Sequence, residues 1–150
     1  IVLLFYIYFV MPDMGVSLTA VQAAIIGLGV AYSAYQAENF RAGIEAIDRG
    51  QIEAAMAMGM SWSLTMRRVV LPQAVKIVLP PYGNIMIMML KDSSQASTIT
   101  VAELALQGKL IAVSTFKNAT VFSLVALMYL VMCVPLILLV RHLEKRSAAK

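Results

Sequence analysis

The chain has 150 residues, of which 61% are hydrophobic and only 13% charged, and its mean hydropathy is +0.82. Because globular chains are roughly 45–50% apolar and about a quarter charged, this composition excludes a soluble domain and a disordered chain. The single cysteine excludes a disulfide within the chain and a cysteine-based metal cluster. The sequence has no basic run for nucleic acid and no phosphate-binding glycine loop. The class of protein left by these exclusions is a membrane protein, and its length indicates a single domain over residues 1–150.

The first segment, residues 1–11, is unbroken apolar sequence that ends at Pro12 and Asp13. It lacks the basic residues that precede the apolar part of a secretory signal. Eleven residues are also too few to cross a bilayer, which takes about twenty. We therefore expect the second half of a transmembrane helix, and a chain that is the C-terminal fragment of a longer protein.

A second span is predicted over residues 18–37, which contain Gln22 but no charge. Ala23, Gly27 and Ala31 fall four residues apart on one face, and such small residues let two helices approach closely in lipid. An Ala- and Gly-rich helix without that role is an equally good interpretation.

The third span is predicted over residues 81–101, after a break at Pro80 and Pro81. Lys91 and Asp92 would then lie at its middle, where a charge costs about 2.5–3.5 kcal/mol on insertion scales. Such residues face a bundle interior or a water-filled path.

The last part of the chain contains one further span, residues 120–140, without any charge. Residues 102–116 are less continuously apolar than a membrane span, and we expect a short interfacial helix and a loop there. The predicted fold class is therefore all-α: a polytopic transmembrane helical bundle with a partial first span and about three full spans.

The distribution of Lys and Arg indicates the orientation. Residues 41–76 contain five and the tail from Arg141 contains four, whereas residues 12–17 contain none and residues 102–118 contain two. This places residues 41–76 and the C-terminus in the cytoplasm. The pI near 9.4 then reflects membrane orientation, with no nucleic-acid partner.

The cytoplasmic segment, about residues 45–72, is predicted to contain two short helices. Asp48 can cap a helix over residues 51–58, and Gly59 would end it. Ser61 can cap a second helix that begins at Trp62 and runs into Leu71-Pro72. The side chains expected to be exposed are small or flexible and would suit a partner groove: Ala54, Ala55, Met56, Met58 and Met60. An interfacial helix on lipid headgroups is at least as good an interpretation.

This segment resembles a known motif. Glu53-Ala54-Ala55, three residues, Gly59, nine residues, Val69, one residue and Leu71-Pro72 match the EAA loop of ABC importer permeases, except that Val69 stands where Ile is usual. Residues 37–44, 79–84 and 90–94 resemble the flanking stretches of polar amino acid permeases. Gln95 departs from that pattern, which has Leu there.

The resemblance implies an ABC transporter permease of the bacterial inner membrane, with no catalytic residue and no cofactor of its own. It implies that Glu53, Ala54, Ala55 and Gly59 dock on a cytoplasmic ATP-binding subunit that hydrolyses ATP-Mg. It also implies a second permease subunit, identical or homologous, an extracytoplasmic substrate-binding protein and an amino acid substrate.

Two groups of polar residues are candidates for the substrate path. Asp92 could bind an ammonium group, with Ser93 and Ser94 supplying hydroxyls; alternatively, Lys91 and Asp92 satisfy each other or nearby backbone. The second group follows a helical spacing on the second span: Tyr32, Tyr35, Gln36 and Asn39. Hydrogen bonding between helices explains this stripe equally well.

Two other functions are alternatives to an ATP-driven permease. An ion-coupled amino acid carrier would use Asp92 or Glu38 to carry a proton. A membrane-embedded enzyme has little support, because one His, one Cys and no paired acidic motif leave few groups for chemistry.

Overall fold

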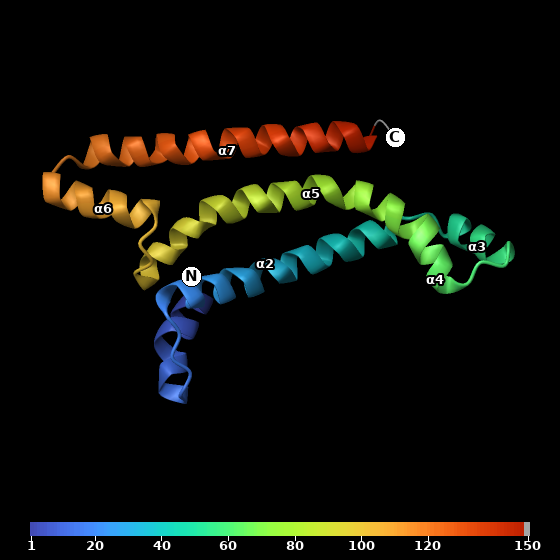
Figure 1. The fold of residues 1–150 in the computed structure, drawn as a ribbon, viewed down its shortest axis with the longest axis horizontal. Helices are drawn as coiled ribbons and strands as arrows, with labels where there is room; N and C mark the ends of the chain where they lie inside the picture. Colours follow the sequence, from blue (N-terminus) through green and yellow to red (C-terminus); the bar gives the residue numbers. More distant parts are fainter. Residues whose placement is uncertain (149–150) are drawn as a thin grey trace. The chain divides into compact units, whose positions relative to one another are not determined.

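The computed structural model describes residues 1–148, with side chains described as far as Lys145. Every regular element in this range is helical, and Figure 1 shows their order along the chain. The elements are α1 (Val2–Phe5), the π turn η1 (Tyr6–Val10), the 3-10 turn η2 (Met11–Met14), α2 (Ala20–Glu45), α3 (Arg49–Ala57), α4 (Trp62–Thr65), the π turn η3 (Met66–Val70), α5 (Leu71–Asp92), the 3-10 helix η4 (Ser93–Ile99), α6 (Leu104–Thr115) and α7 (Asn118–Ala148).

The chain divides into two compact units, which we describe separately. Unit 1 comprises residues 1–33 and 86–137, and unit 2 comprises residues 34–85 and those from Leu138 onward. The long helices α2, α5 and α7 each contribute to both units.

The core of unit 1 forms where α1, η1, α2 and η4 meet. Its buried members are Leu4, Ile7, Ala23, Ala24, Ala96 and Ile99. The stripe of small residues on α2 lies at this contact, since Ala23 is fully buried and a Cβ on Gly27 would lie 2.6 Å from Leu4 Cδ2. The small side chains therefore allow close helix approach, as that interpretation of the stripe requires.

In unit 2, glycine again allows helices to approach closely. A Cβ on Gly43 of α2 would collide with Val78 Cγ2 of α5. A Cβ on Gly83 of α5 would collide with Val140 Cγ1 of α7. Close packing of this kind replaces the hydrophobic effect as the source of helix association in lipid.

Both π turns precede a proline by two residues. In η1, Met11 N–H donates to the Tyr6 carbonyl ahead of Pro12, and in η3, Leu71 N–H donates to the Met66 carbonyl ahead of Pro72. A proline has no N–H, and its ring clashes with the carbonyl four residues earlier. A wider turn accommodates both effects without breaking the helix.

Helix α5 corrects the predicted third span. Pro80 and Pro81 lie inside the helix and do not break it, and at Asp92 the helix passes into the 3-10 helix η4, which continues the helical run to Ile99. Each proline removes its own donor and its ring crowds the carbonyl four residues earlier. The buried contacts of Val78 and Gly83 on either side nevertheless hold the helix together. Lys91 and Asp92 therefore lie where α5 passes into η4, and not at the middle of the helical run Trp62–Ile99.

The other predicted elements differ mainly in length. Helix α2 continues eight residues beyond Ala37 to Glu45, because residues 38–45 contain no proline and only one glycine. Helix α6 matches the short helix expected over 102–116, and α7 extends beyond 120–140 at both ends.

One described helix, Asn118–Lys145, is long and apolar enough on its own to cross a membrane. A second candidate is the pair Trp62–Ile99 and Leu104–Thr115, bent by 55° between its two parts.

Candidate functional site

The corner between α3 and α4 begins with a side-chain cap. Asp48 Oδ1 accepts a hydrogen bond from Gly50 N–H at 2.8 Å, and the Asp48 carbonyl accepts one from Gln51 N–H at 3.1 Å. These bonds satisfy donors at the N-terminus of α3, which no carbonyl within the helix can reach. The predicted capping role of Asp48 is confirmed.

Gly59 ends α3 in the left-handed conformation, with φ of +83°. Gly59 N–H donates to the Met56 carbonyl at 2.9 Å, and Met60 N–H donates to the Ala55 carbonyl at 3.2 Å. This pair of bonds is the Schellman motif, in which glycine is favoured because it has no Cβ. The glycine corner predicted from the sequence is therefore present.

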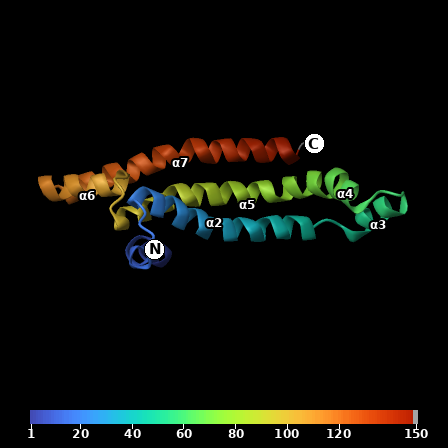
Figure 2. The same ribbon diagram turned by 60° about the horizontal axis from the view of Figure 1, so that its bottom comes forward.

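Helix α4 begins where expected, with Ser61 Oγ accepting from Leu64 N–H at 3.4 Å. It does not stop at Leu71-Pro72, however, but passes through η3 directly into α5. The two helices of the corner lie side by side at one end of α5 in both ribbon views (Figures 1 and 2).

Exposure along this corner partly differs from the prediction. Glu53, Ala54 and Met56 are exposed, and the Met58 side chain is 85% exposed. Ala55, by contrast, is only 6% exposed, and Met60 is half-buried. Because α3 lies against α4 and η3, Ala55 faces this chain and not outward. A surface for a partner would thus consist of Glu53, Ala54, Met56 and Met58.

Asp92 has a partner of its own in unit 1. Its carboxylate accepts a hydrogen bond from the Tyr32 hydroxyl, sixty residues earlier in the chain. The Ser93 hydroxyl donates to the Leu90 carbonyl at 2.7 Å and the Ser94 hydroxyl donates to the Lys91 carbonyl at 2.8 Å. Both serines therefore direct their protons at the end of α5, which leaves oxygen lone pairs as their remaining hydrogen-bonding capacity.

The remaining members of the polar stripe lie in unit 2. Asn39 Nδ2 donates to Gln36 Oε1 at 3.4 Å, and both residues are half-buried, whereas Tyr35 is 66% exposed. The structure thus brings Tyr32 to Asp92 and Gln36 to Asn39. Glu38, the other acidic candidate, pairs with Arg41 at 3.1 Å on the exposed side of α2.

Glu103 is a structural anchor that the sequence reading missed. Its carboxylate caps α6 by accepting from Ala105 N–H at 2.7 Å and Leu106 N–H at 2.6 Å, and it also accepts from the Tyr129 hydroxyl at 2.9 Å. The available signal was an acidic residue directly before an apolar helix. One carboxylate therefore ties α6 to α7.

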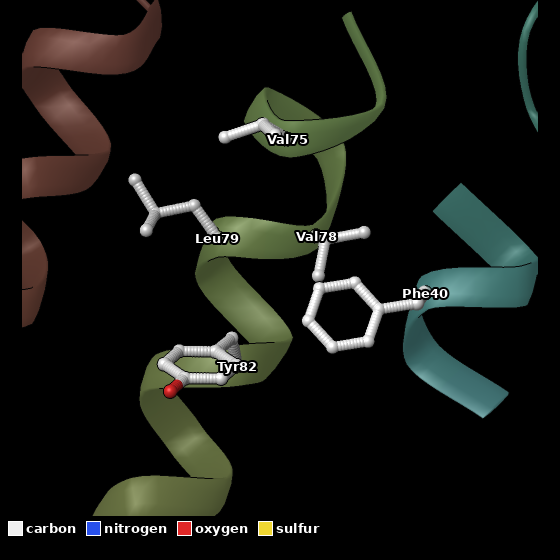
Figure 3. A pocket seen from close by; sticks show the side chains of 5 residues that line it. All are labelled: Phe40, Val75, Val78, Leu79 and Tyr82. Carbon is white, nitrogen blue, oxygen red and sulfur yellow. The ribbon is translucent and has the colours of Figure 1, made fainter. Parts of the chain in front are cut away.

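An apolar pocket lies in the described part of each unit. In unit 2, a pocket of about 240 Å³ lies beside α5. Figure 3 shows the Phe40 ring of α2 directed toward Val78. The pocket is lined by Phe40, Val75, Val78, Leu79 and Tyr82. In unit 1, a pocket of about 270 Å³ includes Ser93 and Glu103 among mainly aliphatic residues. No group of three or more His, Cys, Asp or Glu that could hold a metal occurs among the described residues.

Comparison with known proteins identifies the family. Residues 1–148 match the family described as "Binding-protein-dependent transport system inner membrane component". The chain belongs to this family. Membership confirms the predicted resemblance to amino acid ABC transporter permeases, and it identifies a transport component instead of an enzyme.

Individual permeases of this family are similar over most of the chain. A "Probable glutamine ABC transporter permease protein GlnM" of Bacillus subtilis (strain 168) is 41% identical over 142 residues, 95% of this chain and 66% of the relative. The "Arginine transport system permease protein ArgU" of Corynebacterium glutamicum is 45% identical over 130 residues, 83% of this chain and 41% of the relative. The chain thus spans less than two thirds of the length of these relatives.

A solved permease has the same fold. The structure titled "Crystal structure of an amino acid ABC transporter with histidines" superposes with a TM-score of 0.90 at 39% identity, over 97% of this chain and 68% of that one. The predicted all-α membrane permease architecture is confirmed by this likeness.

Proposed function

We propose that the chain is the membrane-spanning permease part of an ATP-driven importer for polar amino acids. The observation that carries the proposal is the α3–α4 corner, which presents Glu53, Ala54 and Met58 outward in a chain of the binding-protein-dependent transport family. An amphipathic helix with exposed methionine suits a partner's groove. We infer that this groove belongs to a cytoplasmic ATP-binding subunit, where ATP-Mg is hydrolysed.

The charge distribution supports a cytoplasmic position for the corner and the C-terminus. Unit 2 contains nine of the twelve Lys and Arg residues and five of the eight Asp and Glu residues, so its formal charge is +4. Unit 1 contains three of each and is neutral. Most Lys and Arg residues thus belong to the unit with the corner, as the positive-inside rule expects of the cytoplasmic side.

Two further partners complete the proposal. Coupling through a docked corner needs a second permease subunit, identical or homologous, because two ATP-binding subunits close together and each would hold one corner. The family description itself refers to a binding protein, which would deliver the amino acid from outside.

We place the substrate path along the Tyr32–Asp92 pair. A carboxylate held by one hydroxyl donor keeps other lone pairs for an ammonium group, which every amino acid has. The adjacent Ser93 and Ser94 add hydroxyl oxygens, and Tyr35, Gln36 and Asn39 of unit 2 are separate candidates for the path. The ion-coupled alternative finds no support in the family assignment.

Site-directed crosslinking tests the proposal. In the reconstituted transporter, a cysteine at Met58 should crosslink to the ATP-binding subunit. A cysteine at Phe116, 91% exposed on the connection predicted to be extracytoplasmic, should not. Amino acid uptake should stop without ATP and continue with a proton uncoupler. Uptake that collapses with the uncoupler and continues without ATP would instead establish the ion-coupled carrier.

A further inference from the structure

One side chain connects α3 to the base of α5. Gln73 Nε2 donates to Gln51 Oε1 at 2.6 Å and to the Val69 carbonyl at 3.0 Å. The two glutamines are 22 residues apart, on α5 and at the start of α3, and both belong to unit 2. One hydrogen of the Gln73 amide therefore joins α3 to the continuous helix behind it, and the other bonds back to that same helix at Val69 and orients the amide.

Few buried side chains hold α3 against α4 and η3. The helix has nine residues, and Ala55 is its only buried residue. Helices of this length are marginal in water without tertiary contacts. The caps at Asp48 and Gly59 are local bonds, which determine where α3 begins and ends but not how it is turned relative to α5.

The bond lies on the side of α3 away from Glu53. Gln51 and Ala55 are four residues apart and share one helix face, and Ala55 is buried. Glu53 lies two residues from each, on the opposite side, and is exposed. Holding Gln51 therefore directs Glu53 away from the chain.

We propose that Gln73 is a positioning residue for energy coupling, which holds α3 through Gln51 so that its exposed face meets the motor subunit in one orientation. This inference rests on the proposed coupling role of the corner. Without the bond, α3 would still form but would swing about Gly59, and part of each ATP-driven movement would be lost between α3 and α5.

The test measures amino acid transported per ATP hydrolysed, in liposomes that contain the complete transporter. Gln51→Leu and Gln73→Leu should each lower this ratio about three- to tenfold, the size expected for one lost hydrogen bond. Gln51→Glu keeps the oxygen that accepts from Gln73, and its ratio should stay near that of the unaltered protein. The double variant should be no worse than the worse single one, because both remove the same bond.

Gln107→Leu, at an exposed glutamine of α6, is the matched control and should leave the ratio unchanged. A normal ratio in Gln51→Leu would overturn the proposal, and so would a loss in Gln51→Glu as large as in Gln51→Leu. If Gln73→Leu fails to assemble, the comparison of Gln51→Leu with Gln51→Glu still tests the proposal, because Gln51 is exposed and both variants should fold.

Failure here is distinguishable from failure of the proposed function. If Gly59→Val loses coupling while Gln51→Leu keeps it, only the positioning role of Gln73 is wrong. If Gly59→Val also keeps coupling and a cysteine at Met58 does not crosslink, the coupling role of the whole corner is wrong.

Discussion

The main-chain N–H of Met60 reaches back to the carbonyl of Ala55, and this 3.2 Å bond wraps the chain around Gly59. Nothing lies within 4 Å of the position that a Cβ on Gly59 would occupy. The demand for glycine is therefore conformational and not steric.

Gly59→Val should disturb this turn. A left-handed residue with a Cβ costs about 1–2 kcal/mol, and β-branching adds to the strain. We expect a distorted corner and a loss of coupling of about threefold or more, measured as transport per ATP hydrolysed. Gly29→Ala, at a helical glycine that also has open space around it, should keep normal coupling. Normal coupling in Gly59→Val would contradict the role of the corner.

Gly83→Ala should destabilise unit 2, because the new methyl group would meet Val140 of α7. Overpacking of this kind costs about 1–3 kcal/mol. Thermal unfolding of the purified protein in detergent measures the loss. Adding Val140→Ala should restore much of the stability that Gly83→Ala loses. If the stability losses of the two single variants simply add in the double variant, the two residues are not in steric conflict.

Asp92→Asn should reduce uptake more than Tyr32→Phe does. The first change removes the charge proposed to attract an ammonium group, and the second removes one hydrogen bond to that charge, worth about 0.5–1.5 kcal/mol. Uptake measured against amino acid concentration separates affinity from rate. Tyr6→Phe, at an exposed tyrosine of η1, is the control. Uptake by Asp92→Asn with unchanged affinity would remove Asp92 from the substrate path.

Glu103→Ala should destabilise unit 1 more than Tyr129→Phe does. The alanine variant loses the cap of α6, worth about 1–2 kcal/mol, together with the bond to Tyr129. The phenylalanine variant loses only that bond. In thermal unfolding the double variant should match Glu103→Ala alone. A further loss in the double variant would mean that Tyr129 stabilises α7 by some other contact.

Local features were predictable from the sequence because they depend on neighbouring residues. Asp48, Gly59 and Ser61 act within three residues of their own positions, and all three caps occur as expected. Membership of the permease family was likewise evident from a gapless motif.

Features that depend on distant residues were missed or wrong. The predicted break at Pro80-Pro81 ignored the contacts that hold α5 together, and it placed Asp92 at mid-span instead of at the junction of α5 and η4. Ala55 was expected on the outer face, but its burial depends on α4 folding back over α3. The bond between Gln51 and Gln73 crosses 22 residues and has no signal in the sequence pattern.

The passage from α4 through η3 into α5 is uninterrupted, and Trp62 and Asp92 belong to one run of helical turns. In such a run each residue turns the chain by about 100° and advances it by about 1.5 Å. The seven helical residues 62–68, between the corner and Val69, are therefore a measure of angle as well as of length. Inserting one residue there would rotate the docking face by more than a quarter turn around the axis of α5, even if every contact of the motif itself were kept.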